Sequence, residues 1–355
     1  MRYKPHSITL NSTLYDRKGN DTLFMSDYFE EVEYVALESG DSTLMARVEN
    51  LKINDHFIAA YADKKIWVFT RSGDFYSKID KYGKGAGEYT FLSNFNFKND
   101  STIGLIDIDN SKYIEYHVNG TLQSEIKIPA SSMQFSYSEN DDLLVVYPFP
   151  DYGNNDFHFG KNLTTNELFL EDTTFKELLS SEEKIRGLPS TTNISFYRDR
   201  FGDLQYWSFK YDKLLKKEKQ GTEYAQLTID TQEGDVISLF DFYSSFYLSS
   251  LYDGKLYHFI MDKETGHIKK FVFEEGGYLG IIYAFENDID YGLPFVPKFR
   301  SEGDYFVSNV SFQQINDLKN HRENYFGDCT HTGLLDIVTN GNENMNNVIM
   351  IAQLK

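Results

Sequence analysis

Clusters of carboxylate and amide side chains are the residues of this sequence with the clearest potential for chemistry. One cluster falls within "LIDIDNSK" (105–112) and the other within "ENDIDYG" (286–292). Their members are Asp107, Asp109, Asn110, Glu286, Asn287, Asp288 and Asp290. Such groups are calcium ligands by type, and Asp107 and Asp288 are the candidates to hold an ion. Neither stretch has EF-hand spacing, and Asp-Asn at strand ends is ordinary turn chemistry, so a structural role is favoured.

A glycine-rich stretch, "KIDKYGKGAGEYTFL" (78–92), is the second candidate. Its glycines are Gly83, Gly85 and Gly87. A phosphate-binding loop needs a helix directly after the glycines, so that the helix N-terminus faces the phosphates. The residues that follow have no helical pattern. We therefore predict a structural turn whose glycines take up positive φ, while Glu88 and Tyr89 either tie the turn down by hydrogen bonds or line a binding face.

Histidine and cysteine provide weaker candidates. The eight histidines include no H-E-x-x-H motif and no close pair at metal-ligand spacing, so the sequence offers no zinc site. Cys329 stands two residues before His331. This pair is either a reactive thiol beside an imidazole or, as we favour, a loop with a partly buried thiol. No serine occupies a G-x-S-x-G elbow, and no catalytic residue is predicted.

Aromatic residues have a stronger claim to binding. They make up 16% of the chain, with 29 Phe and 26 Tyr, and they are densest in "YPFPDYG" (147–153) and "LQYWSFKY" (204–211). Tyrosine and tryptophan form good surfaces for sugars and peptides. The residues expected to bind such a ligand are Tyr147, Tyr152, Tyr206, Trp207 and Arg300.

Length and charge exclude several classes of protein. At 355 residues the chain is two domains or one closed repeat architecture. A net charge of −19 would repel a phosphate backbone, so nucleic acid is not an expected partner. No apolar run is long enough to span a bilayer, and the first residues lack the apolar region of a signal peptide. The single cysteine excludes an internal disulfide.

Hairpin patterns recur along the chain. "IWVFTRSGDFYSKI" (66–79) and "YIEYHVNGTLQSEI" (113–126) both predict strand, turn and strand. Similar units occur at 227–240 and 258–271, and a four-stranded unit is predicted at 133–172. About four strands in roughly 40–50 residues is the period of a propeller blade. The sequence therefore predicts an all-β, six-bladed β-propeller of four-stranded antiparallel blades.

The ends of the chain are expected to close this ring. An open first or last blade would expose a strand edge, so the strand at 30–38 is predicted to pair with strands near 302–311 and 346–354 in one blade. Residues 1–29 are then an N-terminal extension and residues 30–355 a single domain. Helical pattern is confined to two expected insertions, at 173–185 and 312–324.

The stretch "KIDKYGKGAGEY" resembles the G-x-G-P-G-E-Y signature of the six-bladed, NHL-like β-propeller proteins of Bacteroides and its relatives. "SDYFEEVEYVALE", "ENDIDYGLPFVPKFR" and "NNVIMIAQLK" are similar too. The sequence departs from the signature at Ala86, where the family usually has proline. The resemblance implies an exported protein, often a lipoprotein, held in the periplasm or anchored to the outer membrane, with its leader and lipidated cysteine before the first residue shown. It implies no activity.

Two hypotheses of function result. The first is a non-enzymatic binding or scaffold module of the bacterial envelope, a monomer whose partner is a protein or a glycan and whose membrane contact is only a lipid anchor. It needs no cofactor. The alternative is a calcium-dependent propeller enzyme, of lactonase or lyase type, that works in the central channel.

Overall fold

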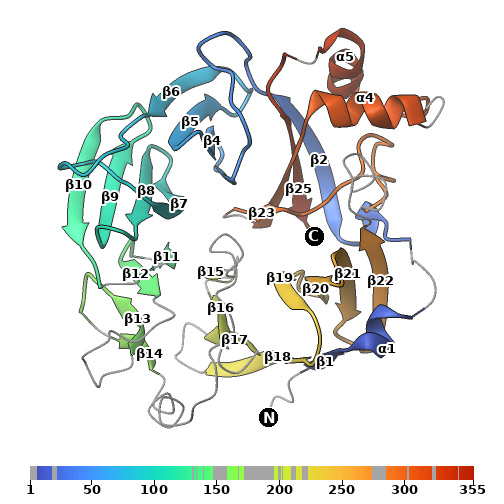
Figure 1. Ribbon diagram of the computed structural model, residues 1–355, viewed down its shortest axis with the longest axis horizontal. Helices are drawn as coiled ribbons and strands as arrows, with labels where there is room; N and C mark the ends of the chain where they lie inside the picture. Colours follow the sequence, from blue (N-terminus) through green and yellow to red (C-terminus); the bar gives the residue numbers. More distant parts are fainter. Residues whose placement is uncertain are drawn as a thin grey trace. The chain divides into compact units, whose positions relative to one another are not determined.

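The structure, a computed structural model, describes most of the chain (Figure 1). The described residues are 6–17, 22–129, 132, 134–138, 140–146, 158–166, 168–171, 196–198, 201, 203–208, 213–217, 223–273, 285–301, 304–321, 325–342 and 344–355.

The described part of the chain is mostly β-structure, as the recurring hairpin patterns predict. Its strands form six sheets, of which five have four strands and one has five. The four-stranded sheets are antiparallel, with the strands of most sheets in chain order. The chain divides into two compact units. The first comprises Met1–Asp63, Val68–Tyr76 and Gln226–Lys355, and the second comprises Lys64–Trp67 and Ser77–Ala225.

Two sheets lie wholly within the first unit. One has the order β2 (Phe29–Ala36), β25 (Val348–Leu354), β24 (Tyr305–Val310), β23 (Phe299–Arg300). The other has the order β19 (Asp235–Asp241), β20 (Ser245–Tyr252), β21 (Lys255–Asp262), β22 (Ile268–Phe273). In the first of these, β25 pairs antiparallel with β2 on one side and β24 on the other. As predicted, the strand near 30–38 shares one sheet with the two C-terminal strands, and it pairs directly with β25.

Aromatic rings dominate the core of the first unit. Phe29 is 1% exposed, and its ring centroid lies 5.2 Å from that of Phe295 and 5.5 Å from that of Phe242. The helices of this unit are α1 (Ser12–Tyr15), the 3-10 turn η1 (Met25–Asp27), α4 (Phe312–His321) and α5 (Thr332–Asn340). Buried side chains of α4 and α5, among them Leu318 and Leu334, belong to the same core cluster. Apolar packing therefore holds both helices on the sheets.

Two further sheets lie wholly within the second unit. One has the order β10 (Leu122–Lys127), β9 (Lys112–His117), β8 (Thr102–Asp107), β7 (Leu92–Asn99). The other has the order β11 (Gln134–Tyr137), β12 (Leu143–Val146), β13 (His158–Asn162), β14 (Leu168–Glu171), and confirms the unit predicted at 133–172. The first strands of the two sheets, β7 and β11, lie side by side, and the Asn94 amide donates to Gln134 Oε1 at 2.8 Å.

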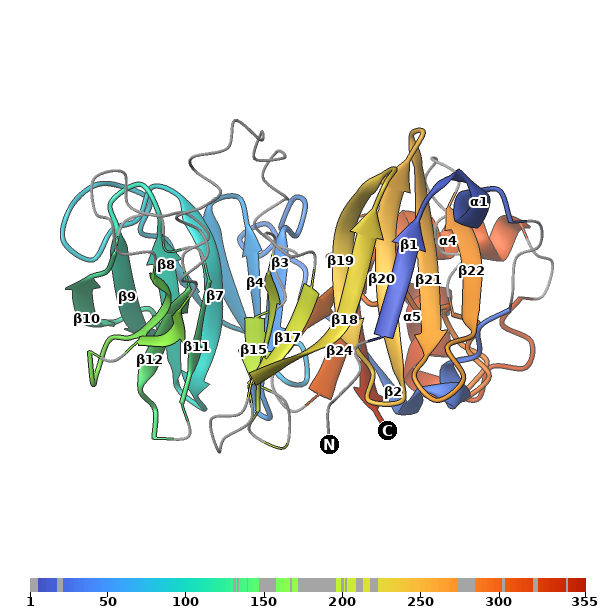
Figure 2. The same cartoon turned by 90° about the horizontal axis from the view of Figure 1, so that it is seen from below.

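The division between the units passes through the strands of the last two sheets. One has the order β3 (Asn50–Ile53), β4 (Phe57–Ala62), β5 (Lys65–Thr70), β6 (Phe75–Ile79). The other has the order β1 (His6–Leu10), β18 (Glu223–Thr231), β17 (Lys213–Lys217), β16 (Leu204–Ser208), β15 (Phe196–Arg198). Figure 2 shows β1 beside β18, and the two strands pair in parallel. The segment expected as an N-terminal extension thus contributes a fifth strand to this sheet.

Three of the four predicted hairpins form, with their turns at the glycines that the sequence indicates. Gly73, Gly120 and Gly266 all have positive φ, between +68° and +97°, at the turns that the sequence indicates. The hairpin predicted at 227–240 is wrong: β18 and β19 flank Gly234 but belong to different sheets. A strand pattern does not tell which neighbour a strand pairs with. The helix predicted at 312–324 is α4, while the one predicted at 173–185 lies outside the described residues.

Candidate functional site

The glycine loop of the second unit is a turn held by side chains, and no helix follows it. Tyr89 is fully buried, and its hydroxyl donates to the carbonyl oxygens of Lys64 at 2.9 Å and Ile79 at 3.2 Å. The Glu88 carboxylate accepts from the Gly85 N–H at 2.7 Å. The residues after the loop enter strand β7, so the loop lacks the helix N-terminus that an anion site needs. Glu88 and Tyr89 therefore have a structural role, because their hydrogen bonds hold the turn in place.

Positive φ is confined to one glycine of this loop. Gly87 has φ of +66°, but Gly83 and Gly85 do not have positive φ, and the expectation for those two is wrong. A side chain at either position would instead meet the carboxylate of Glu88. A Cβ at Gly83 would lie 2.1 Å from Glu88 Oε2, and one at Gly85 would lie 3.0 Å from it. A side chain at Gly83 or Gly85 would push the Glu88 carboxylate away from the turn that it holds. The spacing of the glycines did not reveal this contact.

We expect Gly87→Val to lower the free energy of unfolding by about 2 kcal/mol, because a β-branched residue is strained at positive φ. Gly85→Val should cost less than half as much, since its φ is ordinary and the Glu88 side chain can move aside. Urea unfolding of both variants measures the difference. Equal losses would contradict this account, and tight nucleotide binding that either variant abolishes would restore the phosphate-loop hypothesis.

The two acidic residues considered as calcium ligands are occupied by hydrogen bonds. Asp107 is fully buried and accepts from the backbone N–H of Thr90 at 3.2 Å and of Phe91 at 3.1 Å. Asp288 accepts from the Ser26 N–H at 2.9 Å and the Ser26 hydroxyl at 2.5 Å. Within the described ranges, no group of three His, Cys, Asp or Glu side chains is placed to hold a metal ion. Each acid therefore forms a clasp, in which its hydrogen bonds join two segments of the chain.

The remaining sequence candidates do not converge. Arg300 is buried and forms an ion pair with Asp304 (2.6 Å). Tyr147 and Tyr152 lie outside the described residues, and Tyr206 and Trp207 lie in strand β16.

The Cys329 and His331 pair belongs to the start of α5. Burial raises the pKa of the Cys329 thiol, which disfavours the reactive thiolate. His331 accepts from the Leu334 N–H at 3.2 Å and caps the helix. This cap, the apolar residues after it and Gly341 are a helix signal that the loop interpretation of "GDCTHTG" overlooked.

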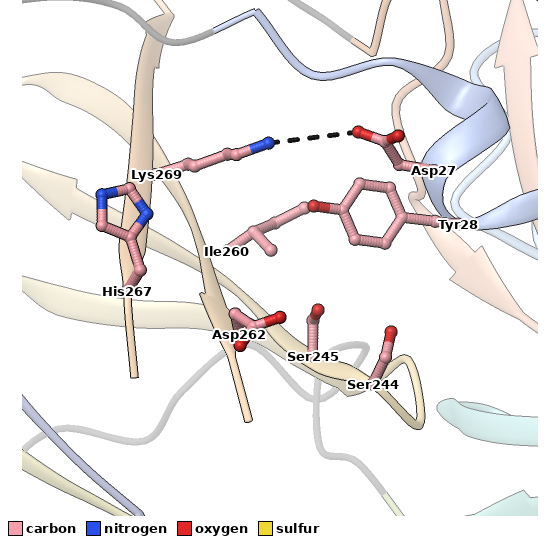
Figure 3. Close-up of a pocket in the computed structure, with 8 residues that line it drawn as sticks. All are labelled: Asp27, Tyr28, Ser244, Ser245, Ile260, Asp262, His267 and Lys269. Atoms are coloured by element: carbon pink, nitrogen blue, oxygen red, sulfur yellow. Dashed lines mark ion pairs between the residues drawn. The ribbon is translucent and has the colours of Figure 1, made fainter. Parts of the chain in front are cut away.

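A polar pocket of about 230 Å³ lies in the first unit, between η1 and the sheet β19 to β22 (Figure 3). Its lining consists of Asp27, Tyr28, Ser244, Ser245, Ile260, Asp262, His267 and Lys269. In Figure 3 the Lys269 side chain extends toward Asp27 along one side, while the two serines and Asp262 line the opposite side. The Lys269 ammonium and the Asp27 carboxylate are 4.0 Å apart, and both are partly exposed.

Two hairpin turns and one clasp position these groups. In the β19–β20 turn the Tyr243 N–H donates to Asp241 Oδ1 at 2.7 Å, which sets the backbone that carries both serines. In the β21–β22 turn Asp262 accepts from the N–H and hydroxyl of Thr265, at 2.6 and 2.7 Å. The Asp288 clasp holds Ser26, the residue before Asp27. Two local turns and one long-range clasp therefore place the groups that line the pocket.

The charges in the pocket are well defined. The hydroxyl and N–H of Thr265 hold the pKa of the Asp262 carboxyl below its ordinary value, because both hydrogen bonds favour the ionised form. Burial, with smaller contributions from Asp27 and Asp262, raises the pKa of the Tyr28 phenol to about 12. Tyr28 is thus a neutral donor at physiological pH. Two carboxylates, one ammonium and several hydroxyls can together donate to and accept from a polyhydroxylated molecule.

Sequence reasoning missed this pocket, since its residues come from four separate segments between 27 and 269. The only sequence signal near the pocket was the turn pattern of "DKETGH". This pattern predicts a hairpin but does not show which other residues pack opposite the hairpin. Pockets of this kind depend on tertiary packing.

The fold and the pocket define a mostly β protein with a small polar pocket and four-stranded antiparallel sheets. The chain belongs to the family described as "Domain of unknown function (DUF4934)", whose profile matches residues 7–201. No curated protein matches the sequence. No helix in the described ranges is long and apolar enough to cross a membrane.

Solved structures similar to this chain include a Bacteroides fragilis protein described as exported. It is 16% identical, with 99% of this chain and 100% of that chain covered and a TM-score of 0.67. A Bacteroides vulgatus protein of the DUF4221 family is 10% identical, covering 92% and 97%, with a TM-score of 0.48. Virginiamycin B lyase from Staphylococcus aureus is 10% identical, covering 68% and 73%, with a TM-score of 0.39. Of these three, the first is similar enough to show a shared fold.

Proposed function

We propose that this protein is a six-bladed β-propeller that acts outside the cytoplasm as a binding module for a saccharide. Six sheets, most of them four-stranded meanders, support the blade number. The pairing of β2 with β25 supports closure of the ring by both ends of the chain. The resemblance to Bacteroides envelope propellers and the fold shared with a protein described as exported support the location.

The pocket is the observation that carries the binding function. Its volume of about 230 Å³ is below the roughly 300 Å³ at which pockets for drug-sized ligands begin, and suits one sugar residue. Carboxylates accept hydrogen bonds from sugar hydroxyls, while Tyr28, the serines and Lys269 donate to ring and hydroxyl oxygens. Ile260 offers an apolar contact for sugar C–H groups.

A neutral saccharide suits this charge better than an anion. The lining holds two carboxylates against one ammonium, in a protein whose net charge is −19. A terminal sugar of a glycan chain is therefore the preferred ligand.

The geometry favours this function over the calcium-dependent enzyme. The two acids on which that alternative depended bind the backbone of Thr90, Phe91 and Ser26 instead of converging on a cavity. The pocket, in contrast, brings donors and acceptors from four segments of the chain around one cavity.

Tyr28→Phe and Asp27→Asn should weaken saccharide binding in calorimetric titrations with a panel of neutral mono- and disaccharides. Loss of the phenol hydroxyl should cost about 3-fold to 10-fold, and loss of the Asp27 charge about tenfold or more, from the strengths of neutral and charged hydrogen bonds. Asp41→Asn, at an exposed carboxylate away from the pocket, is the matched control and should bind like the natural protein. Saccharide binding that is unaffected by both pocket variants, or absent for the whole panel, would refute the proposal.

A further inference from the structure

The floor of the polar pocket is one face of the sheet β19 to β22, and the strand register fixes which of its residues are neighbours. Ser245 on β20 is the direct partner of Asp262 on β21. Ile260, two residues before Asp262, is the direct partner of Lys269 on β22. Directly paired residues, and residues two apart on one strand, point to the same face of a sheet. A hydroxyl, a carboxylate, an aliphatic group and an ammonium are therefore neighbours on this floor.

Tyr28 faces the floor from the opposite wall. It directly follows η1, and in Figure 3 its hydroxyl points across the pocket toward Ile260. Tyr28 is 8% exposed and Ser245 is 3% exposed. Within the described ranges, neither hydroxyl has a hydrogen-bond partner. A buried hydroxyl without a partner is costly, and a ligand atom that accepts from it removes that cost.

Asp262 supplies an acceptor on the floor. Both bonds from Thr265 end on its Oδ1 atom, at 2.6 and 2.7 Å, so the Oδ2 atom can accept from a ligand. Ile260, on the same face of the same strand, lines the pocket and is 2% exposed. The floor thus presents a hydrogen-bond acceptor beside an apolar group, and the opposite wall presents a hydrogen-bond donor.

An acetamido group complements this arrangement. Its amide is planar and trans, so the N–H and the methyl group lie on one side of the C–N bond and the carbonyl oxygen lies on the other. When the N–H donates to Asp262 and the methyl group contacts Ile260, the carbonyl oxygen points away from the floor, toward the Tyr28 hydroxyl. A plain hexose has no methyl group for the apolar contact, and an ammonium group has no acceptor for the phenol O–H.

We propose that the pocket binds the acetamido group of an N-acetylated hexosamine, through Asp262 at its N–H, Ile260 at its methyl group and Tyr28 at its carbonyl oxygen. This inference rests on the proposed saccharide function and narrows its class of ligand. Ser245 and Lys269 remain for ring and hydroxyl oxygens of the same sugar. The phenol and carboxylate oxygens also keep lone pairs for its hydroxyls.

Isothermal titration calorimetry with two matched sets of sugars tests the inference. One set is N-acetylglucosamine, glucose and glucosamine, and the other is N-acetylgalactosamine, galactose and galactosamine. In at least one set the N-acetyl sugar should bind about tenfold more tightly than the other two, because it alone has both the carbonyl acceptor and the methyl group. Equal affinities within both sets, or tightest binding of an amino sugar, would overturn the inference and leave the saccharide function standing. A lack of binding by all six sugars would refute the saccharide function itself.

Two pocket variants separate contact with the acetamido group from a general role in the pocket. Tyr28→Phe removes the donor to the carbonyl oxygen, so it should lower the preference for the N-acetyl sugar over its parent hexose about threefold or more. Asp27→Asn is the matched control, because it should weaken both sugars by a similar factor and leave their ratio unchanged. The ratio is also unaffected by partial unfolding, which lowers the apparent affinity for both sugars alike. An unchanged ratio in Tyr28→Phe would show that the phenol does not contact the acetamido group and would overturn the proposal.

Discussion

Deletion of residues 346–355 is expected to abolish cooperative folding of the first unit. These residues contain β25, an interior strand that pairs with β2 and β24. All but one of its side chains are buried, including Val348, Met350 and Leu354 of the main core cluster. At about 1.5–3 kcal/mol for each buried apolar side chain, the loss reaches the whole stability of a typical domain.

Far-ultraviolet and near-ultraviolet circular dichroism during thermal unfolding measures this effect. The matched control is Gln353→Ala, the less buried position of the same strand, which should change the free energy of unfolding by no more than about 0.5 kcal/mol. A truncated protein that keeps a cooperative transition near the natural melting temperature would show that β25 is peripheral.

Asp107→Ala should lower the free energy of unfolding by about 3–5 kcal/mol. The carboxylate is fully buried and accepts from Thr90, Phe91 and the Asn110 side chain, the last at 2.6 Å. Its removal leaves several polar groups without an acceptor, and each buried unsatisfied group costs about 1–3 kcal/mol.

Guanidinium unfolding followed by tyrosine fluorescence measures this loss. Asp109→Ala, two residues away and exposed, is the control and should stay within about 0.5 kcal/mol of the natural protein. If calcium stabilises the natural protein and Asp107→Ala abolishes that effect, the acid is a metal ligand and the clasp interpretation is wrong.

Local turn chemistry made much of the fold predictable. The turn of the hairpin of β9 and β10 needs one residue with positive φ, and Gly120 supplies it at +86°, whereas Asn119 does not have positive φ. The need to cover a strand edge predicted the pairing of β2 with β25, although the two are separated by almost the whole chain. These features follow from the backbone itself, so one sequence suffices to find them.

Long-range choices were not predictable in the same way. The pattern of residues 6–10 is that of a strand, but nothing local tells that β1 joins β18 in parallel. The helix α5 was missed because it is short and its cap is a histidine, an uncommon capping residue.

The candidate site was the least predictable part. Residue types suggested Asp288 as a metal ligand, whereas it holds Ser26 and so supports the wall of the pocket. Arg300 was expected to bind a ligand, and in the structure it is buried in an ion pair with Asp304. In each case the sequence shows the type of residue, whereas tertiary packing sets the partner of its side chain.

A crystal structure of the protein soaked with the monosaccharide that binds most strongly in the calorimetric panel tests the binding function most directly. We predict density for one sugar residue in the pocket, with its hydroxyls within hydrogen-bond distance of Asp27, Tyr28, Ser245 and Asp262. An empty pocket at saturating sugar, or density bound only elsewhere on the protein, would contradict the assignment of this pocket as the binding site.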